Sequence, residues 1–180
     1  MKLLGTEMYA LGLFAKDSVH PLTGVPQSSV GAPCPMVVAD EHHLSVIFYL
    51  QNTPEGWDGA EVKVVGPDSE DETHAIVSFS SFKAYYHGAP NDEAFSGHPL
   101  SKKGLEPYGA YEVKDSTWIR DLIEMNRVHA YHSDEAFKDY RHFIFSFHDT
   151  TFECVAKGYD ITVGQGSVLG AAQGLLHNRA

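Results

Sequence analysis

The alternation of hydrophobic and polar residues over 141–157 predicts a β-hairpin with two different faces. Phe143, Phe145 and Phe147 point to one side of the first strand. The opposite side carries His142, Ile144, Ser146 and His148. A turn centred on Asp149 and Thr150 would set Phe147 opposite Phe152 and His148 opposite Thr151. The predicted hairpin therefore has an aromatic face and a face of imidazole, hydroxyl and carboxylate groups.

The same two-residue period marks further strands on both sides of this hairpin. Residues 44–51 alternate between the two faces of a strand, and residues 74–86 do so with a change of phase near Ser80. Such a phase change indicates a β-bulge or a bend. Other strands are predicted over 8–14, 61–65, 108–114 and 159–163.

One long amphipathic helix is expected from Ser116 to His129, capped by Asp115 or Ser116. Its apolar stripe contains Trp118, Leu122 and Met125. One or two short helices are expected as well, beginning near 133 and 167. Because strands outnumber helices and short turns join neighbouring strands, we expect an α+β fold with a mainly antiparallel sheet, covered on one face by the long helix.

The chain of 180 residues fits a single globular domain over 1–180. Two segments lack periodicity: 17–35, which is rich in Pro, Gly and Ser, and 88–107. Irregular connections as long as the second one are uncommon in compact domains unless they serve a function or are disordered. The segment 88–107 is therefore the candidate recognition loop.

The formal net charge of −11 argues against nucleic acid and anionic membranes as partners, because both require basic surface. No apolar run approaches the roughly 20 residues of a membrane span, and the amino-terminal residues do not resemble a signal peptide. Two cysteines, Cys34 and Cys154, are too few for a disulfide framework. We therefore expect free thiols and a cytoplasmic location.

Eleven histidines raise the question of a metal site for zinc or another divalent ion, which needs three or four ligands. His142 and His148 lie about 20 Å apart along an extended strand and cannot share one ion. The predicted pairing brings His148 close to Glu153, and His98 in the loop could add a third ligand. The candidate metal ligands are thus His148, Glu153 and His98. A metal-free polar network of Ser146, His148 and Glu153 is the alternative.

Ser146, His148 and Glu153 also contain the three residue types of a catalytic triad. However, Cβ atoms two residues apart on a flat strand are about 7 Å apart, and no glycine pair is placed to form an oxyanion hole. The sequence contains no phosphate-binding loop. No catalytic residue is therefore predicted.

The leading hypothesis is a binding or interaction protein without catalysis or cofactor, which recognises a small polar ligand or a protein partner. Its candidate binding residues are Ser146, His148, Glu153, His98 and Tyr86. The alternative is a metal-dependent hydrolase that uses the histidine and carboxylate ligands. A third hypothesis is that this acidic chain neutralises a basic partner. The sequence leaves room for a homo-oligomer.

Overall fold

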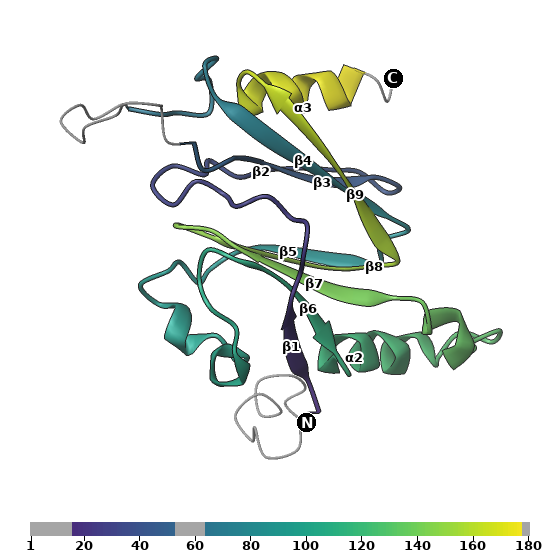
Figure 1. Cartoon of the computed structure of the whole chain (residues 1–180). Helices are drawn as coiled ribbons and strands as arrows, with labels where there is room; N and C mark the ends of the chain where they lie inside the picture. Colours follow the sequence, from purple (N-terminus) through teal and green to yellow (C-terminus); the bar gives the residue numbers. More distant parts are fainter. Residues whose placement is uncertain (1–15, 53–63, 178–180) are drawn as a thin grey trace.

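The computed structural model describes residues 16–52 and 64–177, whose strands form two antiparallel sheets (Figure 1). The five-stranded sheet has the order β1 (Ser18–Pro21), β6 (Ala110–Lys114), β7 (Arg141–Ser146), β8 (Thr151–Ala156) and β5 (Ala84–Gly88). The four-stranded sheet has the order β2 (Met36–Ala39), β3 (Leu44–Tyr49), β4 (Thr73–Ser80) and β9 (Gly158–Gln165). The α+β class is confirmed, but two sheets replace the single predicted one. The strand predicted over 8–14 lies outside the described residues, as do residues 61–63 of the strand predicted over 61–65, and residues 64 and 65 are not in a strand.

The aromatic face of the β7–β8 hairpin packs against the inner face of the four-stranded sheet. The ring centroid of Phe79 on β4 lies 5.4 Å from that of Phe152, and Phe48 on β3 lies 5.2 Å from Phe147. Phe143 and Phe145 also contact Phe79. These rings are almost completely buried, so the aromatic half of the predicted pattern forms the core between the sheets.

One strand pair bends from one sheet into the other. Ser80 pairs with Gly158 in the four-stranded sheet, whereas Ala84 pairs with Val155 in the five-stranded sheet. Three residues on one strand therefore face two on its partner, and Ser81 has a positive φ of 52°. This is the bulge predicted near Ser80. Its consequence is a corner at which both strands change sheets.

The hairpin register differs from the prediction by two residues. Ser146 pairs with Thr151, and Phe145 pairs with Phe152. The turn is longer than expected, and the amide of Phe147 donates to the carbonyl of Thr150 across it (2.8 Å). Because side chains alternate with a period of two, this shift preserves both faces but moves His148 out of the strand and into the turn.

In the described part of the chain, one α-helix lies on the outer face of each sheet (Figure 1). Helix α2 (Thr117–Asn126) lies beside β7, and the Ser116 hydroxyl caps it by accepting the amide hydrogen of Ile119. It ends before His129, and Met125 is 66% exposed, so the long amphipathic helix is not confirmed. Helix α3 (Val168–His177) packs on β2 and β3, and no helix among the described residues is long and apolar enough to cross a membrane.

Both segments without periodicity contain ordered structure. The segment 17–35 provides β1 and a bridge between Ser28 and Leu50, so it contacts both sheets. The segment 88–107 contains the 3₁₀ helices η1 (Phe95–Gly97) and η2 (Ser101–Lys103). Its apolar side chains pack against Ile144 on the outer face of the five-stranded sheet. A third 3₁₀ helix, η3 (Asp134–Phe137), stands where a short helix was predicted.

The two cysteines are free thiols, as the sequence indicated. Cys154 is part of the core between the sheets, where burial raises the pKa of its thiol well above the ordinary value. Burial also raises the pKa of the Cys34 thiol, which packs near α3. Both thiols are therefore poor nucleophiles.

We predict that Phe79→Ala lowers the free energy of unfolding by about 3 to 5 kcal/mol, because it leaves a cavity among the rings of both sheets. Met125→Ala, at an exposed position, should change it by less than about 0.5 kcal/mol. Urea unfolding measures both values. Equal losses for the two variants would show that the rings do not form the core.

Candidate binding site

Glu153 on β8 lies between two histidines on the outer face of the five-stranded sheet. One carboxylate oxygen is 3.1 Å from Nε2 of His98, and the other is 2.9 Å from Nε2 of His142. His98 comes from the loop between η1 and η2, and His142 comes from the neighbouring strand β7. Loop packing thus brings His98 to two residues of the β7–β8 hairpin, which strand pairing already holds together.

The opposite ring nitrogen of each histidine is also engaged. Nδ1 of His98 accepts the amide hydrogen of Leu100 (3.1 Å), which makes Nε2 the nitrogen that donates to Glu153. Nδ1 of His142 lies 2.9 Å from the Ser116 hydroxyl. The Ser116 oxygen also accepts the Ile119 amide hydrogen, so Ser116 joins His142 to the start of α2. Each imidazole therefore directs Nε2 at the carboxylate, while its Nδ1 atom is held on the opposite side of the ring.

Glu153 is an ionised and largely buried group. Its side chain is only 17% exposed, and the flanking imidazoles of His98 and His142 are 6% and 5% exposed. Burial by itself would raise the pKa of Glu153, but the hydrogen bonds from His142 and His98, together with the electrostatic attraction of these two groups, outweigh burial and hold the pKa at about 2. Among the described residues, no lysine or arginine forms an ion pair with this carboxylate.

A cavity of about 380 Å³ opens above this carboxylate. Its walls include the rings of Trp118 and Tyr86. Trp118 stands edge-to-face against His142 with ring centroids 5.1 Å apart, and Tyr86 is the direct cross-strand neighbour of Glu153. The remaining lining residues are Asp17, His98, Pro99 and Leu100. The cavity therefore combines aromatic walls with an anionic floor.

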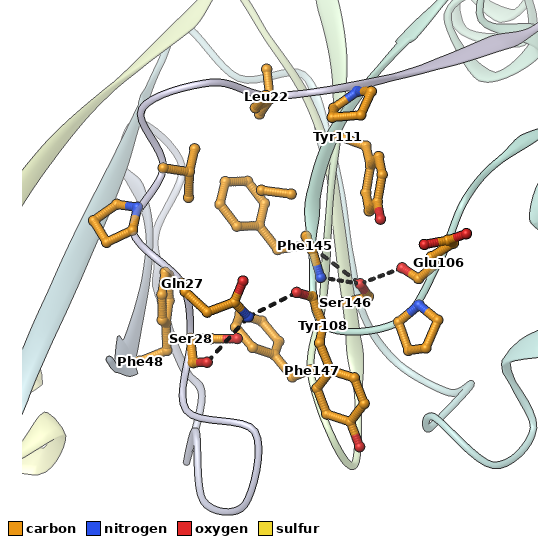
Figure 2. Close-up of a pocket in the computed structure, with 16 residues that line it drawn as sticks. Leu22, Gln27, Ser28, Phe48, Glu106, Tyr108, Tyr111, Phe145, Ser146 and Phe147 are labelled. Atoms are coloured by element: carbon orange, nitrogen blue, oxygen red, sulfur yellow. Dashed lines mark hydrogen bonds between the residues drawn. The ribbon is translucent and has the colours of Figure 1, made fainter. Parts of the chain in front are cut away.

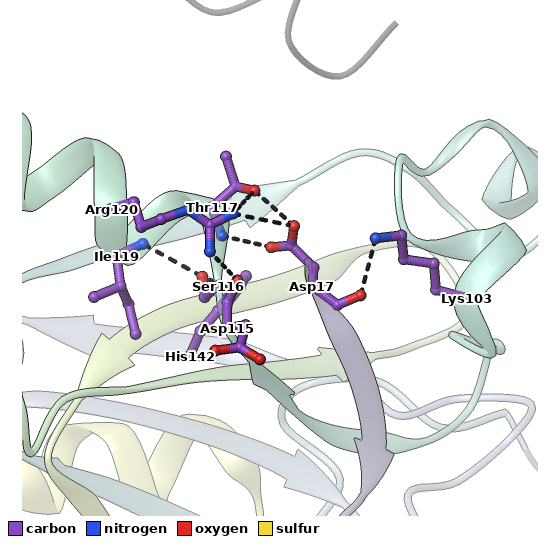
Figure 3. Close-up of polar contacts among 8 residues, drawn as sticks. All are labelled: Asp17, Lys103, Asp115, Ser116, Thr117, Ile119, Arg120 and His142. Carbon is purple, nitrogen blue, oxygen red and sulfur yellow. Dashed lines mark hydrogen bonds and ion pairs between the residues drawn. The ribbon is translucent and has the colours of Figure 1, made fainter. Parts of the chain in front are cut away.

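Asp17 connects the rim of the cavity to the start of α2 (Figure 3). Its carboxylate accepts hydrogen bonds from the amide and the hydroxyl of Thr117 and lies 3.6 Å from Arg120. Burial opposes ionisation of Asp17, but the bonds from Thr117 lower its pKa. The Lys103 ammonium donates to the Asp17 carbonyl (2.9 Å), so the η2 loop and β1 are joined at the same point.

The structure brings together three of the sequence-predicted site residues: His98, Glu153 and Tyr86. Ser146 has a different role. Its hydroxyl accepts the amide hydrogen of Gly109 and lies 2.9 Å from the carbonyl of Glu106, beside a separate cavity of about 320 Å³ (Figure 2). Ser146 therefore fixes the chain that leads into β6 and does not line the Glu153 cavity.

His148 also lies elsewhere. In the turn its Nδ1 atom is 3.2 Å from a carboxylate oxygen of Asp149 and 3.7 Å from one of Asp92, and its ring stands against Tyr108. The two-residue change of register explains this, because the pairing that placed His148 beside Glu153 does not form. In the part of the chain that the structure describes, no three His, Cys, Asp or Glu side chains are grouped to hold a metal ion.

His142 is the site residue that sequence reasoning did not select. In the observed register Glu153 pairs with Ile144, so His142 is its diagonal neighbour on the polar face. The alternation pattern placed His142 on the correct face of the strand. It does not determine the length of the turn, and the choice between His142 and His148 depends on that length. Ser116, His142 and Glu153 form a hydrogen-bonded chain, yet Ser116 caps α2 and does not line the cavity.

No protein family model, no curated protein and no solved structure matches this chain. Its function must therefore be inferred from the chemistry of the Glu153 cavity.

We predict that acid weakens the wild-type fold through Glu153. Because its pKa falls from 4.5 to about 2 on folding, the ionised carboxylate stabilises the protein above pH 4.5. That stability, on the order of 3 kcal/mol, should be lost as the pH falls from 4.5 towards 2. Urea unfolding across this range, compared with Glu153→Gln, measures the effect.

Glu153→Gln keeps all other carboxylates, so the difference between the two proteins isolates the contribution of Glu153 to the pH dependence of stability. The amide introduced by Glu153→Gln would direct its hydrogen atoms at one of the two imidazole N–H groups, so the variant should be the less stable protein at pH 7. The difference between the two proteins should shrink as the pH falls. A difference that stays constant from pH 7 to pH 2 would contradict the assigned pKa.

Proposed function

We propose that the protein is a binding protein whose Glu153 cavity takes a small organic cation with an ammonium or guanidinium group. The observation that supports this most directly is a buried carboxylate that is hydrogen-bonded to two imidazoles and, among the described residues, to no lysine or arginine. A buried carboxylate that no lysine or arginine neutralises is costly, and a ligand of opposite charge lowers that cost. Each oxygen of Glu153 retains acceptor capacity for such a ligand.

The aromatic walls favour the same ligand chemistry. Trp118 and Tyr86 line the cavity together with the imidazole and carboxylate floor. The faces of such rings attract ammonium and guanidinium groups, and the attraction is stronger where water is excluded. An anionic ligand would meet the carboxylates of Glu153 and Asp17 instead, so like-charge repulsion excludes it.

Size and overall charge are also compatible with this function. A cavity of about 380 Å³ is within the range of sites that hold small molecules. The net charge of −11 would attract cations over a longer range, with a dependence on salt. A lysine or arginine side chain of a basic protein partner carries the same cationic groups. The same cavity could therefore accept either a small polar ligand or a side chain of a basic partner. We retain a cytoplasmic location as part of this proposal.

We predict that butylammonium or butylguanidinium binds the purified protein, whereas butanol and butyrate do not. Isothermal titration calorimetry measures the affinity. Intrinsic fluorescence in a Trp57→Phe background reports whether Trp118 senses the ligand, since these are the two tryptophans of the chain. Raising the salt concentration should weaken binding.

Two pocket variants and one matched control make this test decisive. Glu153→Gln and Trp118→Leu should each weaken cation binding about tenfold or more, a change of about 1.4 kcal/mol. Glu135→Gln removes an equal charge at an exposed site and should leave the affinity unchanged. The proposal fails if neither cation binds the wild type, or if Glu135→Gln weakens binding as much as the two pocket variants do.

A further inference from the structure

Strand β9 presents an open backbone edge. The amide of Gly166 donates to the carbonyl of Glu72, which fixes the alternation: even-numbered residues of β9 bond to β4, and the backbone groups of odd-numbered residues point away. These odd-numbered residues are Tyr159, Ile161, Val163 and Gln165. Within 16–52 and 64–177, β9 pairs with β4 and with no other strand.

The other three edge strands are short and flanked by proline. β1 has four residues and ends at Pro21, β2 has four residues and follows Pro35, and β5 has five residues with Pro90 soon after it. Proline and short length are common ways of blocking unwanted strand pairing. By contrast, β9 has eight residues, no proline or lysine, and Asp160 as its one charged residue. Of the four edge strands that the structure describes, β9 is the one without such protection.

We propose that two copies of this protein pair through β9, antiparallel and about a two-fold axis at Thr162. This register is consistent with the alternation above, because it sets odd-numbered residues opposite odd-numbered residues. Ile161 then faces the partner's Val163, and Tyr159 faces the partner's Gln165. The four-stranded sheets of the two copies become one continuous eight-stranded sheet.

The side chains of β9 suit this register. Val163 is 53% exposed, and the pairing covers it with the isoleucine of the other copy. Thr162 lies opposite Thr162 of the other copy, and a Thr–Thr pair across two strands is favourable on a sheet surface. Asp160 lies opposite the partner's Gly164, so the two copies bring no like charges into direct opposition. The edge is therefore complementary to itself in hydrogen bonding, packing and charge.

Sedimentation velocity of the full chain from 1 to 100 μM tests the association. The wild type should shift from monomer to dimer over this range. Val163→Pro removes one outward amide and keeps the bonds to β4, so it should remain monomeric. Val163→Thr keeps the amide and is the matched control, which should still dimerise. A monomeric wild type at 100 μM, or a Val163→Pro variant that dimerises equally well, would overturn the proposal.

A cysteine cross-link tests the register itself. The two copies of residue 162 form a non-hydrogen-bonded pair with Cα atoms about 4.5 Å apart, close enough for a disulfide. Mild oxidation should therefore convert Thr162→Cys to a covalent dimer. Asp160→Cys should stay uncross-linked, because its two copies are several residues apart along the paired strands. Equal cross-linking of both variants, or of neither, would contradict this pairing.

Discussion

The β7–β8 hairpin has to satisfy two opposite environments at once, and this requirement organises the whole structure. One face of its strands carries the phenylalanines that join the two sheets, and the other face carries His142 and Glu153. Because side chains alternate strictly along a strand, the core between the sheets fixes the orientation of the carboxylate. Packing of the phenylalanines in the core thus directs the side chains of His142 and Glu153 to the outer face of the five-stranded sheet, where the cavity lies.

The aromatic core and the anionic cavity are linked through the elements that cover the outer face of the five-stranded sheet. Phe95 and Leu100 pack the 88–107 segment onto this face, which brings His98 to Glu153. Ser116 caps α2 and at the same time contacts His142. The groups that orient the two imidazoles are therefore parts of the backbone and of a helix cap, which gives the carboxylate a preorganised surround.

The sequence predicted the features that depend on local alternation, but it did not predict the turn length or the contacts between distant segments. The two faces of the hairpin and the bulge near Ser80 follow from a period of two. The turn length does not. An error of two residues there placed Ser146 opposite Glu153 and His148 diagonal to it, whereas Ile144 is opposite and His142 is diagonal. The division into two sheets and the end of α2 at Asn126 depend on packing between distant segments, which periodicity along the chain does not contain.

Glu153 is ionised although it is buried, and its charge is what the proposed choice of ligand rests on. A pH titration followed by NMR of the ¹³C-labelled Glu153 carboxyl group, assigned with Glu153→Gln, measures this ionisation without any ligand. We expect a titration midpoint near pH 2, the value that the hydrogen bonds and the electrostatic attraction of the two histidines impose. A midpoint at or above 4.5 would show that burial prevails over these bonds, and it would refute the anionic character of the cavity.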